Sequence, residues 1–222
     1  MFKPYYKDEL VTIINGNSLD IIKNFPDALV ITDPPFNINY HYKDYKDNLS
    51  INEYNNLLIN CCRSPSVVVH YPEELFNLSS ILGIIPNKMV AWVYPSNTGK
   101  QWRGICWFGC QPNFKLDSQP YKNPNDKRVK KLIESGKQCR LYDWWEINQV
   151  KNVNKDKTEH PCQMPIEVMR RIIKITQPKL ILDPFCGSGT TLLAAKQLGI
   201  PSIGIDIDEK YCEISKNRIN KI

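Results

Sequence analysis

The chain has 222 residues, of which 42% are hydrophobic, and a formal net charge of +6. This length suits one well-buried α/β domain with an insertion and is short for two independent domains. No run of eighteen apolar residues and no charged-then-apolar leader occurs, which argues against a membrane protein or an exported one, so we expect a cytoplasmic chain.

The positive charge is concentrated in one segment. Residues 96–160 contain thirteen Lys and Arg against seven Asp and Glu, so the whole excess of six charges lies there. A basic patch confined to an insertion predicts a phosphate-binding surface, and solvated lysines are the alternative. The eight cysteines are scattered through strand-like and helix-like segments, which favours reduced thiols over a disulfide framework.

The N-terminal segment predicts two strands joined by a helix. Residues 10–14 form an apolar, β-branched run, Asn17 or Ser18 can cap a short helix over 19–24, and residues 28–32 form a second strand. Such a unit favours parallel strands and a right-handed crossover.

The second strand ends at an acidic residue that two prolines follow. Because Pro34 and Pro35 have no N–H, the turn offers only acceptors, namely the Asp33 carboxylate and the Pro34 carbonyl, with the Phe36 ring close behind. Such a site suits a planar molecule that carries an NH2 group. A rigid strand-ending turn without a ligand is the alternative.

The next stretch, residues 37–50, is polar and rich in Tyr and Lys. It predicts a mobile loop that folds over a bound polymer, or else a connector without function. Beyond it, the pattern predicts helices over 51–61 and 73–82 and strands over 66–70 and 88–94.

From residue 96 the periodicity weakens and aromatic residues alternate with cations. These are Trp102, Trp107, Phe108, Tyr121, Trp144 and Trp145 among Lys100, Arg103, Lys122, Lys127, Arg128, Lys130, Lys131, Lys137 and Arg140. Stacking on bases and pairing with phosphates requires this combination, and we favour it over a small satellite core with a wet exterior. Cys106, Cys110, Cys139 and His160 could surround zinc, but no Cys-x2-Cys pair occurs, so we expect no metal.

A second motif lies near the C-terminus. After a helix predicted over 166–175, residues 180–191 predict a strand, a glycine turn and the start of a helix that runs to 198. A further strand, 203–206, ends in Asp206 about twenty residues after the turn, where an acidic side chain binds ribose hydroxyls. No phosphate-loop lysine follows, so the hydroxyls of Thr190 and Thr191 could instead hold a carboxylate or an ammonium. A nucleoside with an amino-acid tail meets these requirements.

Three motifs resemble those of the DNA amino-methyltransferases. Residues 183–191 (DPFCGSGTT) resemble the S-adenosylmethionine-binding motif, residues 33–36 (DPPF) resemble the catalytic motif, and residues 160–165 (HPCQMP) resemble a His-Pro-Thr-Gln-Lys-Pro element. The catalytic motif comes first and the cofactor motif last, as in the β-type arrangement. The segment 96–159 resembles nothing that we can name.

The resemblance implies a circularly permuted, Rossmann-like α/β fold with a mostly parallel sheet and an inserted recognition region. We expect a catalytic half over 1–95, a basic and aromatic recognition region over 96–159 and a cofactor half over 160–222. With strands 181–183, 203–206, 11–14 and 28–32 numbered one to four, the sheet order is 3-2-1-4. Both ligands then meet where the order reverses, between strands one and four.

The resemblance also assigns the site residues. The catalytic group comprises Asp33, Pro34, Pro35 and Phe36. The expected cofactor contacts are Asn17, His160, Gln163, Asp183, Phe185, Cys186, Gly187, Ser188, Gly189, Thr190, Thr191 and Asp206. The expected substrate contacts are Asn37, Tyr40, Lys100, Arg103, Lys127 and Arg128. The family pattern departs at Met164, where a lysine is usual, and at Asn17, where an aspartate is usual.

The implied reaction is methyl transfer from S-adenosylmethionine to the N6 amine of an adenine flipped out of double-stranded DNA. Cytosine-N4 and RNA adenine methylation, a DNA- or cofactor-binding module without turnover, and a nucleotide-dependent oxidoreductase are the alternatives. A homodimer that shares DNA contacts and a cognate restriction nuclease are the partners that we consider.

Overall fold

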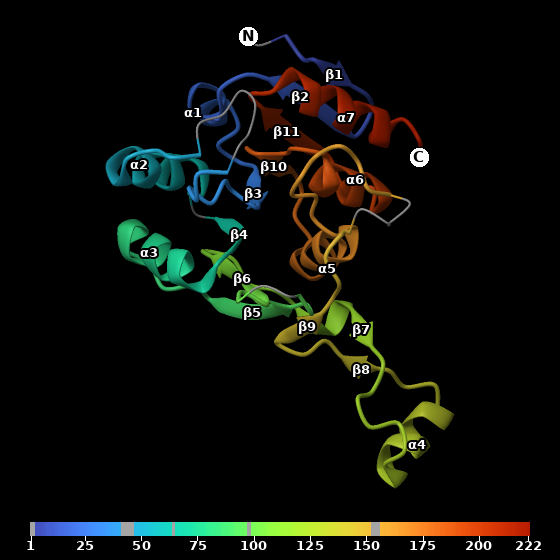
Figure 1. The fold of residues 1–222 in the computed structure, drawn as a ribbon. Helices are drawn as coiled ribbons and strands as arrows, with labels where there is room; N and C mark the ends of the chain where they lie inside the picture. Colours follow the sequence, from blue (N-terminus) through green and yellow to red (C-terminus); the bar gives the residue numbers. More distant parts are fainter. Residues whose placement is uncertain (1–2, 41–46, 64, 97–98, 152–155) are drawn as a thin grey trace.

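The computed structural model describes residues 3–40, 47–63, 65–96, 99–151 and 156–222. Within them, a central sheet is covered by helices on both faces, and a thin arm that carries α4 leaves the body at one end (Figure 1). The strands are β1 (Tyr6–Lys7), β2 (Val11–Asn15), β3 (Leu29–Thr32), β4 (Ser66–His70), β5 (Lys88–Val93), β6 (Trp102–Phe108), β7 (Ser118–Gln119), β8 (Cys139–Arg140), β9 (Trp144–Glu146), β10 (Ile181–Asp183) and β11 (Ser202–Asp206). The helices are α1 (Ser18–Ile21), α2 (Ile51–Cys61), α3 (Pro72–Leu82), α4 (Lys127–Glu134), α5 (Ile166–Thr176), α6 (Thr190–Gln197) and α7 (Glu209–Ile219), with 3-10 turns at Ile22–Asn24 and Phe114–Leu116.

The described strands of the main sheet follow the order β1-β2-β11-β10-β3-β4-β6-β5-β9. The core β2-β11-β10-β3-β4 is parallel throughout. The predicted order 3-2-1-4 is therefore confirmed as β2-β11-β10-β3. The chain enters this sheet at β2 and β3, and the late strands β10 and β11 then fill the space between them.

Alternate residues of the buried strands face opposite helix layers, as the pleat of a strand requires. Ile31, Val67 and Val69 pack in the cluster formed with α5 and α6, while Val30 and Val68 pack in the cluster formed with α1, α2 and α3. These strands are buried on both faces, which explains why they are continuous apolar runs in the sequence.

The predicted helices and strands outside 96–159 are confirmed to within one or two residues. Asn17 caps α1 by accepting a hydrogen bond from the N–H of Leu19, as one of the two predicted caps. Ser50 and Glu53 form a capping box that fixes the start of α2.

The segment 96–159 differs from the prediction. Its first part, Trp102–Phe108, is β6, which pairs with β4 and β5 inside the main sheet, and Trp144–Glu146 is β9, which pairs with β5. Trp107, Phe108 and Trp145 are fully buried, so the prediction that these three rings contact nucleic acid is wrong. Apolar burial on both faces competes with base stacking for the same residue types, and here burial prevails.

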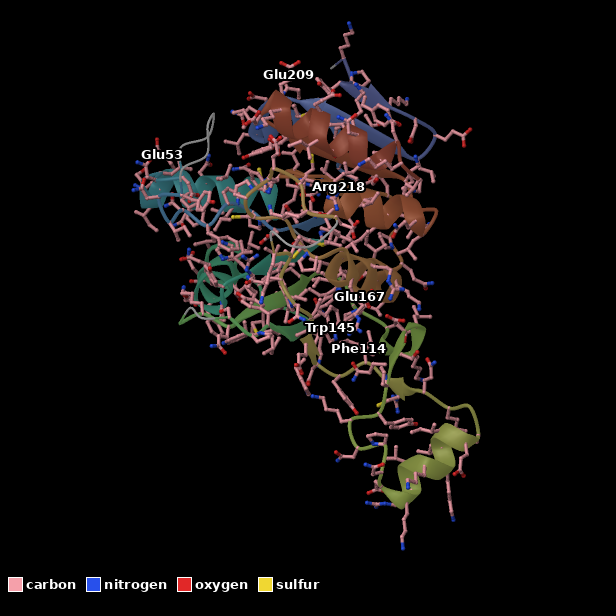
Figure 2. All side chains as sticks on the ribbon, turned by 45° about the vertical axis from the view of Figure 1, so that its right-hand side comes forward. Glu53, Phe114, Trp145, Glu167, Glu209 and Arg218 are labelled. Atoms are coloured by element: carbon pink, nitrogen blue, oxygen red, sulfur yellow. The ribbon has the colours of Figure 1, made fainter. Side chains whose placement is uncertain are left out.

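Among the described residues of this segment, the part between β6 and β9 is the one that leaves the body (Figure 1). It carries the short β7–β8 pair and α4, none of whose residues is buried. Figure 2 shows Phe114 and Trp145 where this arm joins the body, with the side chains of α4 projecting away from it. The basic arm, defined as residues 115–140, contains Lys115, Lys122, Lys127, Arg128, Lys130, Lys131, Lys137 and Arg140.

Candidate active site

A cavity of about 360 Å³ lies at the carboxyl edge of the parallel strands. Asp33 follows β3, while Asp183 and Asp206 end β10 and β11, and all three side chains line it. Because β10 lies between β11 and β3, this edge is the point where the strand order reverses, at which open α/β sheets bind ligands. The two distant motifs therefore share one cavity.

Most of the predicted site residues line this cavity. They are Asn17, Asp33, Pro34, Pro35, Phe36, Tyr40, Arg103, His160, Asp183, Phe185, Cys186, Gly187, Ser188, Thr190, Thr191 and Asp206. Six others do not line it, namely Asn37, Lys100, Lys127, Arg128, Gln163 and Gly189. Lys127 and Arg128 lie on the basic arm, and Lys100 pairs with Glu73 on the surface.

Asp33 is held by one cation. Its Oδ2 accepts a hydrogen bond of 3.1 Å from Nη1 of Arg103, which β6 carries, while its Oδ1 is buried and has no hydrogen-bond partner among the described residues. Burial raises the pKa of the Asp33 carboxyl to about 6 although Arg103 opposes this rise. Asp33 is therefore mainly ionised and an acceptor at pH 7 and above.

Arg103 was expected to contact substrate, together with exposed cations. Its side chain is only 11% exposed, and its guanidinium lies 4.6 Å from the ring centre of Phe36 and 5.4 Å from that of Trp92. Arg103 therefore lines the cavity as a largely buried cation and is not part of the exposed basic surface.

A relay of hydrogen bonds supports the proline turn from behind. The N–H of Tyr71 donates to Nδ1 of His70, and burial lowers the pKa of His70 to about 3, so the neutral ring carries its proton on Nε2. That Nε2 lies 2.8 Å from the hydroxyl of Tyr54, which donates to the Pro35 carbonyl at 3.0 Å. The relay fixes the turn from which Asp33 and Phe36 project.

Phe36 lies against a wall of aromatic rings. Its ring centre is 4.3 Å from that of His70 and 4.7 Å from that of Tyr71, with the planes tilted in both pairs. These contacts restrict the ring of Phe36, which remains half-buried and lines the cavity. A planar heterocycle can stack at such a surface.

The glycine turn after β10 needs both of its glycines. Gly187 and Gly189 have φ values of 49° and 73°, in the left-handed region. A Cβ on Gly187 would lie 2.8 Å from Nε2 of His160, and one on Gly189 would lie 2.0 Å from Oγ of Ser215. Gly189 therefore serves the packing of the turn on α7, which explains its absence from the cavity wall.

Asp206 braces the same turn from β11. Its Oδ2 accepts from the N–H of Gly187 at 2.8 Å, and its Oδ1 accepts from the N–H of Asp208 at 2.9 Å. Burial nevertheless raises the pKa of its carboxyl to about 7. Each oxygen has a further lone pair, so Asp206 can also accept from ligand hydroxyls.

Asp183 and the two threonines take part in internal bonds. Asp183 Oδ1 accepts from Thr32 Oγ1 at 2.8 Å and from the N–H of Phe185 at 3.2 Å, which ties β10 to β3. Thr190 Oγ1 donates to the Met164 carbonyl at 3.3 Å, and the hydroxyl of Thr191 hydrogen-bonds to Asp183. These groups shape the cavity wall, and their hydroxyls are less available to a ligand than the sequence alone suggested.

Arg218 is a residue that the sequence analysis missed. From α7 its Nη1 reaches the Ser188 carbonyl at 2.6 Å and Thr190 Oγ1 at 2.9 Å, so it clamps the end of the glycine turn. Figure 2 shows Arg218 between the helices near the centre of the body. No sequence motif marks it, because its role depends on how α7 packs on the turn.

The 160–165 element contributes His160, Cys162 and Met164 to the cavity wall. The His160 ring packs against that of Tyr211 in a tilted arrangement with ring centres 4.4 Å apart, and burial lowers the pKa of the His160 imidazole to about 4. Gln163 was expected to contact the cofactor, but its side chain bonds to Thr158 and Asp156 instead. Met164 lines the cavity where the family pattern has lysine.

The neck of the loop over 37–50 is fixed by a buried carboxylate. Asp47 accepts from the N–H groups of Asn37, Ile38 and Tyr40 at 2.9–3.0 Å, and Asn37 makes two further bonds to the backbone of Leu49. Asn37 therefore holds the loop, while Tyr40 and Asp47 line the cavity. The predicted tip, residues 41–46, lies outside the described residues.

Some wall residues could have been anticipated. Tyr71 follows β4 beside β3, and Asp208 comes two residues after β11, so both lie at the carboxyl edge once the strand order is known. Tyr211 follows no strand end directly, so its place in the cavity wall could not be anticipated in this way. In the part of the chain that the structure describes, no group of three His, Cys, Asp or Glu side chains could hold a metal, and no helix is long and apolar enough to cross a membrane.

Comparisons with known proteins agree on one family. The profile of the N6/N4 DNA methylases matches residues 28–217. The chain is 30% identical to the type II methyltransferase M.ScaI of Streptomyces caespitosus, over 98% of this chain and 84% of that protein. Two solved structures share the fold, namely the M1.HpyAVI complex with S-adenosylmethionine (TM-score 0.61, 23% identity, 95% of this chain and 100% of that one) and the cytosine-N4-specific PvuII methyltransferase (TM-score 0.65, 19% identity, 99% and 96%).

Proposed function

The chain belongs to the N6/N4 DNA methylase family, and we propose that it transfers a methyl group from S-adenosylmethionine to the N6 amine of an adenine flipped out of double-stranded DNA. One observation carries the proposal. The acceptor turn at Asp33 and the glycine turn that ends at α6 line the same cavity at the switch point of the sheet.

The residues of the cavity fit S-adenosylmethionine, which supplies an electrophilic methyl group on a sulfonium. Because Gly187 has no Cβ, the His160 ring packs directly on the turn, and both residues line the cavity where the cofactor would lie. Asp206 stands at the end of β11, where a carboxylate binds ribose hydroxyls. The amide oxygen of Asn17 caps α1 and keeps one lone pair with which it can accept from an adenine amine.

The turn at Asp33 suits the amine that receives the methyl group. An exocyclic amine is a poor nucleophile, because its lone pair is delocalised into the ring. Asp33 and the Pro34 carbonyl accept its two N–H groups, which localises that lone pair and stabilises the positive charge that develops on nitrogen. Phe36 stacks on the ring and offsets about 1–3 kcal/mol of the cost of flipping the base.

Adenine is the proposed base rather than cytosine. The resemblance supports this, since family members with aspartate first in the catalytic motif are mostly adenine-N6 enzymes, whereas cytosine-N4 enzymes more often carry serine. The pocket chemistry itself serves either amine.

The basic arm is the proposed contact to DNA phosphates, through Lys127 and Arg128 among others. In support, α4 has no buried residue, and the arm carries eight of the basic side chains. The double variant K127Q/R128Q should weaken DNA binding several-fold at about 0.1 M salt and lower the salt slope of log K by about two. The double variant K23Q/K179Q removes equal charge from the body and should change neither. Equal slopes in both variants would contradict the assignment.

Partners and location remain part of the proposal. A homodimer could share DNA contacts between two small recognition arms, and a restriction nuclease of the same sequence specificity could accompany the chain. We also propose a cytoplasmic location, where the homodimer and the nuclease would meet the DNA.

The test is to identify the product. The purified protein is incubated with labelled S-adenosylmethionine, DNA of mixed sequence and RNA of mixed sequence, and the digested nucleosides are separated and identified by mass. N6-methyladenine supports the proposal, N4-methylcytosine corrects the base, and label found only in RNA or in no nucleic acid refutes it.

A further inference from the structure

The pairing between Asp33 and Arg103 leaves each partner with an unused polar atom. Only Oδ2 and Nη1 meet, at 3.1 Å, while Oδ1 of Asp33 and Nε of Arg103 are buried without a partner among the described residues. A side-on pair would use both oxygens of the carboxylate. The observed pair therefore holds the carboxylate by one oxygen and leaves the other uncommitted.

From this geometry we infer that Arg103 is a positioning residue that keeps Asp33 ionised and oriented as a hydrogen-bond acceptor for the amine. The inference rests on the proposed function and deepens it. It assigns to Arg103 a task that its place among surface cations in the sequence does not suggest.

The surroundings leave this task to Arg103 alone among the described residues. Those that face the pair are Asp183 from β10, His70 from β4, Tyr94 directly after β5 and Tyr71 directly before α3. Asp183 disfavours a second negative charge at Asp33, and His70 is neutral because burial and Arg103 lower its pKa to about 3. Lys100 and Glu73 form an exposed ion pair beyond the Tyr71 ring, and their opposite charges largely cancel at Asp33.

The guanidinium itself is held in place. In β6, Arg103 lies opposite Trp92 of β5, and its Cζ is within 5.7 Å of the ring centres of Phe36, Tyr71 and Trp92. Cation–π contacts of this kind stabilise a charge that is removed from water. A planar, permanently charged group suits this enclosure better than the compact ammonium of lysine.

Ionisation of Asp33 decides which hydrogen bonds the turn can make. A carboxylate accepts from the amine, whereas a neutral carboxyl carries a hydroxyl hydrogen that competes with the amine N–H for the same space. Burial already raises the pKa of Asp33 to about 6 with Arg103 present. Without the cation, the neutral acid would extend further into the working pH range.

The experiment measures single-turnover methyl transfer with saturating DNA and cofactor from pH 5 to pH 9.5. The wild-type rate should fall below about pH 6. In R103Q the fall should begin at least about one pH unit higher, so that the rate at pH 7 is lower by about twofold or more and recovers near pH 9. R103K should keep the wild-type pH profile with a modest loss of rate, and R170Q, which removes a cation from α5, should match wild type.

Two results overturn the inference. An R103Q rate that is equally low at every pH indicates a structural role, and a defect confined to the KM for DNA with a lower salt slope indicates a phosphate contact. Recovery at high pH is the outcome that neither of these roles produces.

A second measurement does not depend on methyl transfer. The ¹³C resonance of the Asp33 carboxyl, assigned by its loss in D33N, should titrate near pH 6 in the wild-type protein and at least about one unit higher in R103Q. If the wild type methylates no DNA, the proposed function fails while this titration still decides the role of Arg103. If R103Q does not fold, a wild-type Asp33 carboxyl that remains protonated at pH 8 overturns the inference.

Discussion

The turns after β3 and after β10 lie side by side at one edge of the sheet but have opposite hydrogen-bonding character. The turn at 34–36 begins with two prolines and presents acceptors, whereas the turn at 184–189 contains two glycines and directs N–H groups inward, such as that of Gly187 to Asp206. One suits a ligand that donates N–H groups, and the other permits a close approach to the backbone.

The two turns are also supported differently. The glycine turn is tied by its own backbone, by Asp206 and by the clamp of Arg218, and the hydroxyl of Ser18 donates to the Pro184 carbonyl beside it. The proline turn depends on side chains behind it, namely Tyr54 and Arg103. A turn without N–H groups cannot hold itself, so its position depends on neighbouring elements.

Removing the acceptor should have the largest effect and should separate the two turns. D33A should lower methyl transfer by about 10³-fold or more, because the amine loses its principal acceptor, while cofactor affinity changes less than about threefold. Labelled methyl incorporation and calorimetric cofactor binding measure the two quantities. D27A, an exposed carboxylate on the body, serves as the control. A D33A enzyme with near-normal turnover would remove the chemical role from the proline turn.

Replacing Asp206, which supports the glycine turn, should have a moderate effect, and this effect should fall on cofactor affinity rather than on turnover. D206N should weaken cofactor binding roughly tenfold to a hundredfold, because an amide replaces the carboxylate acceptor. The turnover of the saturated enzyme should fall much less.

The same variant should alter the pH dependence of stability. The pKa of Asp206 is raised to about 7 in the fold, so the wild type binds this proton more tightly folded than unfolded and loses stability as the pH rises from about 4 to about 7. D206N lacks this loss, so its stability relative to wild type should rise by about 4 kcal/mol between pH 4 and pH 8. Denaturant unfolding without cofactor at the two pH values checks this, and a pH-independent difference would contradict it.

The smallest effect should come from the support behind the proline turn. Y54F removes the hydroxyl that bonds to the Pro35 carbonyl and to His70. This should lower the free energy of unfolding by about 1 kcal/mol and lower turnover about threefold to tenfold. Cofactor affinity should stay unchanged. Y6F, at the far edge of the sheet, is the matched control. A loss of cofactor affinity in Y54F would mean that the two turns are not supported independently.

The sequence predicted the parallel core well, because strands buried on both faces are apolar runs that end at Asp33, Asp183 and Asp206. It also predicted that these carboxylates meet, since parallel strands bring their carboxyl ends to one edge. The prolines and glycines beside these carboxylates mark the turns, so the strand ends could be predicted from neighbouring residues alone.

The sequence predicted β6 poorly. Its run Trp-Arg-Gly-Ile-Cys-Trp-Phe contains Arg103 and two tryptophans, which locally resemble a basic, aromatic binding surface. Only pairing with β4 and β5 directs Trp107 into the core and Arg103 toward Asp33. Arg218 was missed for the same reason, because its partners Ser188 and Thr190 lie at the end of a turn that sequence spacing alone does not bring to α7.

The late entry of β10 and β11 between β2 and β3 has a consequence for biosynthesis. A nascent chain that has emerged from the ribosome only as far as α5 holds two parallel strands with a two-strand gap between them, and it lacks the partners of Thr32 and Asn15. Contacts between segments so far apart form late during translation. Incomplete chains therefore lack the sulfonium side of the pocket, so methylation competence should arise in a single step, once the strand that ends at Asp206 has joined the sheet.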